Sequence, residues 1–305
     1  MTDFIASVTS TDEASLVEIN TLRVVAGEVS SAESATLAYL RWLCVENPYR
    51  AAKVAAIRSD DRLAAISLMI PVPLHVGARD GTGYFIVEVL THPDFRGKGL
   101  FSRLIEAMKT ECSNEGSWLL GHPNRAALPG WTKKGMKFGN ELVPRVLVPT
   151  LSPRRFRTIC NDVAGWRHTD LSQIVELANS STSSAMRPVV APDESFFRWR
   201  FGSRPGVHYR LSALQRRGRA VAYVVSKAFK PGVELAVDWA IPTPMLWTSI
   251  GRPTILPLSQ SAFRPLWGAF PANIPITKKM MPVFATPPDG SQSDTDGLTL
   301  IASDF

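Results

Sequence analysis

Residues 96–99, Arg-Gly-Lys-Gly, have the types and spacing that bind an anion. The apolar run at 84–90 predicts a strand before them, and the amphipathic run at 101–108 predicts a helix after them. Two glycines allow a sharp turn and a close approach of the backbone to a ligand. The first amides of the helix, its dipole, Arg96 and Lys98 all favour negative charge. We predict a pyrophosphate site.

The spacing excludes the two commonest phosphate loops. A P-loop needs G-x-x-x-x-G-K followed by Ser or Thr, and a dinucleotide-binding fold needs G-x-G-x-x-G. Neither pattern occurs in T-H-P-D-F-R-G-K-G-L-F, which begins at Thr91.

A second segment supplies the context that the first lacks. The apolar run at 118–120 leads into G-H-P-N and then R-A-A-L-P-G-W-T-K-K-G-M. Together the segments resemble the GNAT superfamily of acyl-CoA N-acyltransferases, which combine an R-x-x-G-x-small loop with a later strand and an Asn-led pattern. The residues that match this later pattern are Asn124, Ala127, Trp131, Gly135 and Met136. The chain departs from the family at Phe101, usually Gly or Ala, and at Met136, usually aromatic.

The resemblance implies acetyl-CoA as co-substrate and direct attack of an amine on its thioester in a ternary complex. The central strand, 85–91, is then expected to splay from its neighbour, with an amide near Val89 to Thr91 stabilising the developing oxyanion. The residues implied to bind acetyl-CoA are Val89, Leu90, Thr91, Arg96, Gly97, Lys98, Gly99, Leu100, Phe101, Asn124 and Trp131.

Glu88 is the carboxylate on the predicted central strand, and strand alternation decides which face it occupies. It is either a general base acting through a water or a strand residue satisfied by a cross-sheet partner. His92 and His122 flank the strand ends, where a structural role is favoured, and Asp238 is a further candidate. The sequence also leaves open which group acts as the general acid that protonates the leaving thiolate. GNAT enzymes often have Tyr at the position of Trp131, and an indole has no accessible acidity.

The chain also contains a repeat at an offset of 157 residues. L-R-W-L-C-V-E-N-P begins at Leu40, and F-R-W-R-F-G-S-R-P begins at Phe197. Both copies continue into a strand, a charged turn and a second strand, which predicts a helix end, a proline break and a β-hairpin. No R-x-x-G-x-G loop follows Pro242 in the second copy.

We therefore expect an α/β (α+β) fold of two GNAT-like domains, each a mixed, mostly antiparallel central sheet flanked by helices. Residues 1–150 form the domain with the acyl-CoA loop. Residues 151–305 form a degenerate copy that serves the acceptor side or the structure, with the boundary within 148–170.

Composition narrows the remaining classes. The 305 residues are 45% hydrophobic and 20% charged, typical of a globular protein, and no apolar run approaches the roughly 18 residues of a membrane helix. The first residues do not resemble a signal peptide, and the three cysteines lack metal-ligand spacing, so we expect a cytoplasmic protein with reduced thiols and no metal. The net charge of +7 is scattered, which argues against a nucleic-acid partner.

The leading hypothesis is an N-acetyltransferase, monomeric or homodimeric, that acts on a small-molecule primary amine, with an amino sugar as one candidate. One alternative is an acyl-CoA-binding regulatory or sensing protein. Another is a protein or aminoacyl acyltransferase whose second domain holds a larger acceptor.

Overall fold

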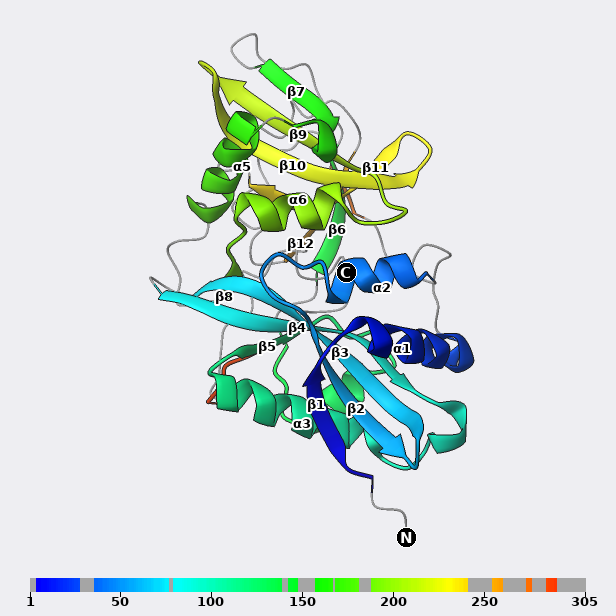
Figure 1. Ribbon diagram of the computed structural model, residues 1–305. Helices are drawn as coiled ribbons and strands as arrows, with labels where there is room; N and C mark the ends of the chain where they lie inside the picture. The colour runs from blue at the N-terminus through cyan, green and yellow to red at the C-terminus, as the bar shows by residue number, and fades with distance from the viewer. Residues whose placement is uncertain are drawn as a thin grey trace.

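The computed structural model consists of two β-sheets, each flanked by helices (Figure 1). It describes residues 4–27, 36–76, 79–138, 142–147, 157–166, 168–180, 188–240, 254–259, 273–275 and 284–289. The predicted mixed α/β fold with two sheets is confirmed.

The first sheet has the strand order β1-β2-β3-β4-β5-β14, and β8 pairs with the outer part of β3. Its strands are β1 (Ala6–Ser10), β2 (Lys53–Ser59), β3 (Arg62–Val76), β4 (Arg79–Thr91), β5 (Trp118–Gly121), β8 (Pro188–Val190) and β14 (Phe284–Thr286). All neighbours are antiparallel except β4 and β5.

Helices cover both faces of this sheet. One face carries α1 (Glu13–Ala26) and α2 (Leu37–Cys44), and the other carries α3 (Leu100–Glu115) and the short α4 (Leu128–Lys133). The short 3-10 helix η1 (Pro93–Phe95) joins β4 to the turn before α3. Two apolar cores result, one on each face of the sheet.

The second sheet has the order β13-β6-β12-β11-β10-β9-β7. Its strands are β6 (Leu142–Leu147), β7 (Arg157–Asp162), β9 (Tyr209–Arg216), β10 (Arg219–Lys230), β11 (Val233–Ala240), β12 (Thr254–Ser259) and β13 (Asn273–Pro275). Its helices are η2 (Val163–Gly165), α5 (His168–Ser180) and α6 (Glu194–Gly202). The parallel pair β11 and β12 corresponds to β4 and β5.

The sequence repeat is also a structural repeat. Helices α2 and α6 begin at the same offset, with side-chain caps from Thr36 and Asp193. The hairpins β2–β3 and β9–β10 follow in both copies, and each turns through a residue with positive φ, Asp60 (54°) and Arg217 (53°). The predicted helix end and hairpin are thus present twice. The segment after Pro242, where no second loop is expected, lies outside the described residues.

Strands are exchanged between the two halves of the chain. β6, from the first half, lies in the second sheet beside β12. β14, from the end of the chain, lies in the first sheet beside β5, and β8 pairs with β3. Three strands therefore cross the boundary predicted at residue 150. Each sheet is completed by the other half.

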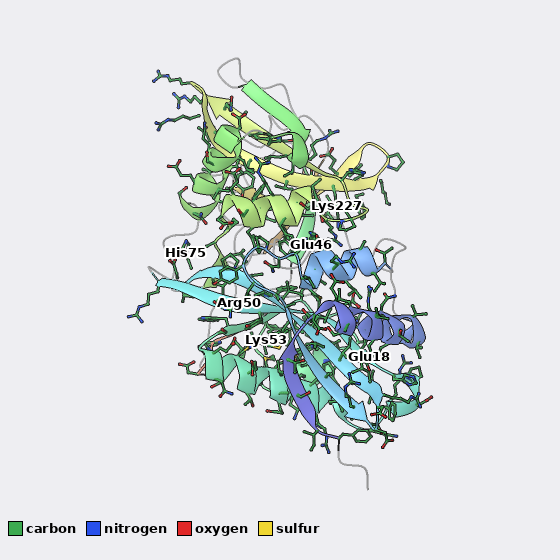
Figure 2. All side chains as sticks on the ribbon, in the orientation of Figure 1. Glu18, Glu46, Arg50, Lys53, His75 and Lys227 are labelled. Atoms are coloured by element: carbon green, nitrogen blue, oxygen red, sulfur yellow. The ribbon has the colours of Figure 1, made fainter. Side chains whose placement is uncertain are left out.

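Charged side chains on the first sheet and its helices pair locally. Figure 2 labels two of these residues, Glu18 on α1 and Lys53 on β2. Lys53 contacts Glu111 and Glu115 of α3, and Glu18 of α1 pairs with Arg58. No helix in the described part of the chain is long and apolar enough to cross a membrane.

Candidate functional site

The central feature of the first sheet is the point where β4 and β5 separate. Their parallel pairing runs from Gly83 opposite Trp118 to Ile86 opposite Gly121 and ends there. The segments that contain β4 and β5 both continue beyond this point, and a cleft of about 680 Å³ lies between them. The splay expected of the central strand is therefore present.

A β-bulge in β4 forms part of the cleft wall. Val87 pairs with Leu68 and Leu90 pairs with Ile66, so Glu88 and Val89 stand together opposite one residue of β3. Glu88 has a φ of 52°, uncommon for a residue with a side chain. A bulge removes backbone groups from the ladder between strands and makes them available to a ligand.

The Arg-Gly-Lys-Gly turn follows at the end of β4 and is exposed. Gly97 and Gly99 have φ of 76° and 73°, and a Cβ on either would meet no atom within 4 Å. The glycines are thus required by backbone conformation, and open space surrounds them. Helix α3 starts at Leu100, so its first amides face this space.

The two basic side chains of the turn have protein partners. Arg96 donates from Nη2 to the carbonyl of Ala26 (3.1 Å) and from Nε to that of Thr91 (3.4 Å). Lys98 lies over the ring of Phe95, with its Nζ 4.8 Å from the ring centroid. Arg96 therefore ties the turn to the end of α1.

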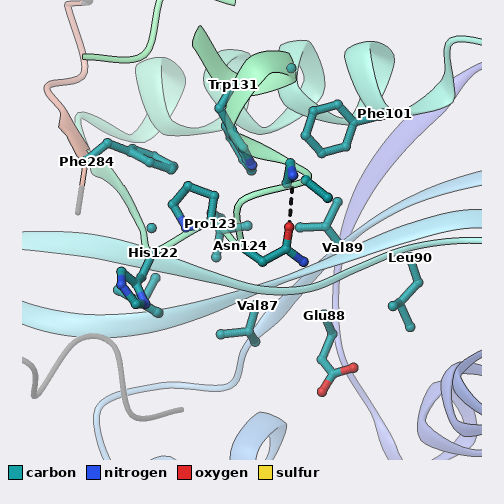
Figure 3. A pocket seen from close by; sticks show the side chains of 16 residues that line it. Val87, Glu88, Val89, Leu90, Phe101, His122, Pro123, Asn124, Trp131 and Phe284 are labelled. Atoms are coloured by element: carbon teal, nitrogen blue, oxygen red, sulfur yellow. Dashed lines mark hydrogen bonds between the residues drawn. The ribbon is translucent and has the colours of Figure 1, made fainter. Parts of the chain in front are cut away.

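One wall of the cleft is aromatic (Figure 3). Trp131 is 2% exposed, its ring centroid lying 5.5 Å from that of Phe101 and 4.8 Å from that of Phe284. The cleft is lined by Phe85, Ile86, Val87, Glu88, Val89, Leu90, Phe101, Gly121, His122, Pro123, Asn124, Ala126, Ala127, Gly130, Trp131 and Phe284. A Cβ on Gly130 would lie 2.5 Å from the Phe101 ring, so glycine is needed for this packing.

Asn124 lies where β5 leads into α4. Its Oδ1 accepts a hydrogen bond from the backbone N–H of Ala127 (2.8 Å), which fixes the turn into that helix. The N–H groups at the other end of the amide are then the donors that Asn124 can offer a ligand.

Glu88 reaches the cleft from the bulge, but its carboxylate is engaged. Arg23 of α1 donates from Nε to Oε2 (3.0 Å) and from Nη2 to Oε1 (3.2 Å). The side chain of Arg23 is 1% exposed, and that of Glu88 is 16% exposed. In Figure 3 the carboxylate points away from Trp131 and Phe101. The partner of Glu88 therefore lies on a helix and not across the sheet.

The fold places the other three titratable candidates in different parts of the structure. His122 lines the cleft, whereas His92 lies beside Asp94 and Arg62 outside it. Asp238 is buried on β11 and accepts a hydrogen bond from the Tyr223 hydroxyl (2.8 Å). Burial raises the pKa of Asp238 to about 7. The fold does not bring it to the cleft.

The predicted donor-binding residues form two groups. The first group, which lines the cleft, is Val89, Leu90, Phe101, Asn124 and Trp131. The second group lies at the end of β4 (Thr91), in the turn (96–99) and at the start of α3 (Leu100). The sequence reasoning missed Arg23 and Phe284. Arg23 could have been found as a charge on the apolar face of α1. Phe284 gave no sequence signal.

The comparisons with known proteins agree with this geometry. The model of the acetyltransferase (GNAT) domain family matches residues 26–126, a span that contains the turn, the bulge and Asn124. No curated protein matches the chain. Residues 26–126 thus resemble a GNAT acetyltransferase domain, and the class of enzyme that such domains define is the acyltransferases.

Solved structures of GNAT proteins have a similar fold over most of this chain. GCN5-related N-acetyltransferases from Kribbella flavida and Anabaena variabilis both align with a TM-score of 0.69, at 15% and 13% identity. Each alignment covers 93% of this chain, and 71% and 73% of the respective relative. A tandem GNAT protein from the clavulanic acid biosynthesis pathway aligns with a TM-score of 0.57 at 12% identity, over 95% of this chain and 100% of its own.

Proposed function

We propose that this protein transfers an acetyl group from acetyl-CoA to a primary amine of a small molecule, by direct attack in a ternary complex. The observation that carries the proposal is the cleft between β4 and β5, which has a bulged strand along one side and the Arg-Gly-Lys-Gly turn at its end. An extended donor with a charged diphosphate at one end and a reactive thioester at the other fits such an arrangement.

The residues present are suited to the donor. The amides at the start of α3 and the backbone of Gly97 and Gly99 would hold the diphosphate, where the helix dipole adds favourable charge. The amide of Asn124 and the aromatic wall around Trp131 would contact the pantetheine arm. Acetyl-CoA supplies the activated acyl group.

The bulge of β4 would serve the chemical step. A backbone N–H near Val89 donates to the thioester oxygen and stabilises the charge that develops there. The amine nitrogen bonds to the carbonyl carbon, the carbon–sulfur bond breaks, and the sulfur leaves as a thiolate. Holding both reactants in one cleft supplies much of the rate gain.

The proton of the attacking amine needs an acceptor. Glu88, acting through a water, is the acceptor we propose, and it works as one unit with Arg23, which engages both carboxylate oxygens. His122 is the other titratable side chain in the cleft wall. Acetyl-CoA is a cytoplasmic metabolite, so we place the activity in the cytoplasm.

One observation favours a second candidate function. Trp131 is buried at the position where related enzymes often have a tyrosine that protonates the leaving sulfur, and an indole cannot do this. A protein that binds acyl-CoA and senses or regulates without transfer would tolerate this replacement. Release of free thiol in the presence of any amine would count against it.

The test uses a matched pair of variants at Gly99. Both Asn and Asp tolerate positive φ better than other residues with side chains, so both keep the turn. Gly99→Asp places a negative charge beside the diphosphate and is expected to weaken acetyl-CoA binding by roughly tenfold or more, whereas Gly99→Asn changes it little. Calorimetry and a thiol-release assay with an amine panel measure binding and turnover. Equal affinities of the two variants, or no acetyl-CoA binding by the unmodified protein, would overturn the proposal.

A further inference from the structure

The inner end of the cleft is closed by a residue from the end of the chain. Phe284 of β14 pairs with Gly121 at the point where β4 and β5 separate, and its side chain is fully buried. In Figure 3 it lies at the end of the cleft opposite to Leu90 and Phe101.

The ring of Phe284 is fixed on three sides. Its centroid lies 4.8 Å from that of Trp131 and 5.5 Å from that of Phe138. Beneath it is Gly121, where a Cβ would lie only 2.5 Å from the ring. The ring therefore occupies the space directly above the strand, packed between Trp131, Phe138 and the backbone of Gly121.

The position of this ring bears on the acyl group. The inference rests on the proposed function, in which the diphosphate lies at the turn and the arm runs along β4. The thioester then lies beside the bulge at Val89, and Ile86 lies three residues further along the strand. An acyl group that continues past the thioester therefore points toward the end of the cleft where Ile86, Gly121 and Phe284 meet.

We propose that Phe284 sets the length of the acyl group that this enzyme accepts and restricts it to acetyl. A longer chain would have to enter the volume that the ring occupies. Since the ring is held by Trp131, Phe138 and the bare backbone of Gly121, it forms a wall and not a movable gate. The specificity of a site built by the first half is thus decided by a strand near the end of the second.

The experiment compares acetyl-CoA, propionyl-CoA and butyryl-CoA by calorimetry and by thiol release with an accepted amine. The unmodified protein is expected to prefer acetyl-CoA over butyryl-CoA by roughly tenfold or more, the scale of discrimination that a pocket wall provides per added methylene. Phe284→Leu is expected to narrow this preference, and Phe284→Ala to abolish or reverse it.

Phe138→Leu is the matched control, because Phe138 contacts the same ring but does not line the cleft. It removes an aromatic neighbour and should retain the preference for acetyl-CoA. If Phe284→Ala does not fold, the Leu variant carries the comparison.

Two results have different meanings. Unchanged selectivity in the Phe284 variants, or equal use of all three donors by the unmodified protein, overturns the role of Phe284 alone. A protein that binds none of the three overturns the proposed function as well.

Discussion

The indole N–H of Trp42 donates to the backbone carbonyl of Trp199, and the indole N–H of Trp199 donates to that of Trp42, each at 2.9 Å. The two rings stack with centroids 5.0 Å apart and an interplanar angle of 22°. The pair is separated by 157 residues, the offset of the repeat. The two halves therefore meet through equivalent residues in a reciprocal contact, as the subunits of a symmetric dimer do.

This reciprocity predicts the effect of removing either indole N–H. Trp42→Phe and Trp199→Phe keep an aromatic ring but each remove one buried hydrogen bond, which costs about 0.5 to 1.5 kcal/mol. We expect the two variants to lose similar amounts of unfolding free energy in urea. Very different losses would show that the contact is reciprocal in geometry but not in energy.

Arg23 and Glu88 are predicted to act as a unit. Removing one partner leaves the other charge in a largely buried position, so Arg23→Gln and Glu88→Gln should each lower kcat by roughly 10- to 100-fold, with the double variant no worse. Steady-state kinetics of the three proteins measure this. Strictly additive losses would contradict it.

Asp238 predicts a pH dependence of stability. Burial raises its pKa to about 7 in the folded protein, against about 3.9 in an unfolded chain. Between these values the folded state binds more protons, so stability should fall as the pH rises from about 4 to about 7. The slope is at most about 1.4 kcal/mol per pH unit.

Asp238→Asn removes this titration and can still accept the hydrogen bond from the Tyr223 hydroxyl. Urea unfolding of both proteins across the range should give a difference in unfolding free energy that changes steadily with pH. Parallel curves would mean that Asp238 does not titrate there.

Because the two halves exchange strands, we expect neither half to form the acetyl-CoA site when it is expressed alone. A fragment of residues 1–150 lacks β14. In this fragment β5 loses its pairing partner, and Gly121 loses the Phe284 ring that packs over it. We expect it not to bind acetyl-CoA by itself and to regain binding when co-expressed with residues 151–305. A soluble, binding-competent fragment would show that β14 is dispensable.

Much of the site could be predicted from local sequence. The turn at 96–99 requires positive φ at two positions that glycine provides, and its place between a strand and a helix follows from hydrophobic periodicity. The repeat likewise identified α2, α6 and their hairpins, because caps, turns and alternation are properties of neighbouring residues.

The role of Glu88 could not be settled in this way. Strand alternation assigns a side chain to one face or the other, but the bulge interrupts that alternation at this residue. Its partner, Arg23, lies on α1, 65 positions earlier in the chain. The ion pair depends on how the helix packs on the sheet.

What the sequence by itself determined was the class of protein, the Arg-Gly-Lys-Gly turn and the repeated helix and hairpin, all of which are recorded in short-range patterns. Only the tertiary structure decided which strand completes which sheet, that Trp42 meets Trp199, and that Phe284 closes the cleft. These are contacts between segments far apart in the chain. They arise because each half leaves an open strand edge and an apolar face that the other half covers, and no local pattern records which surface will do so.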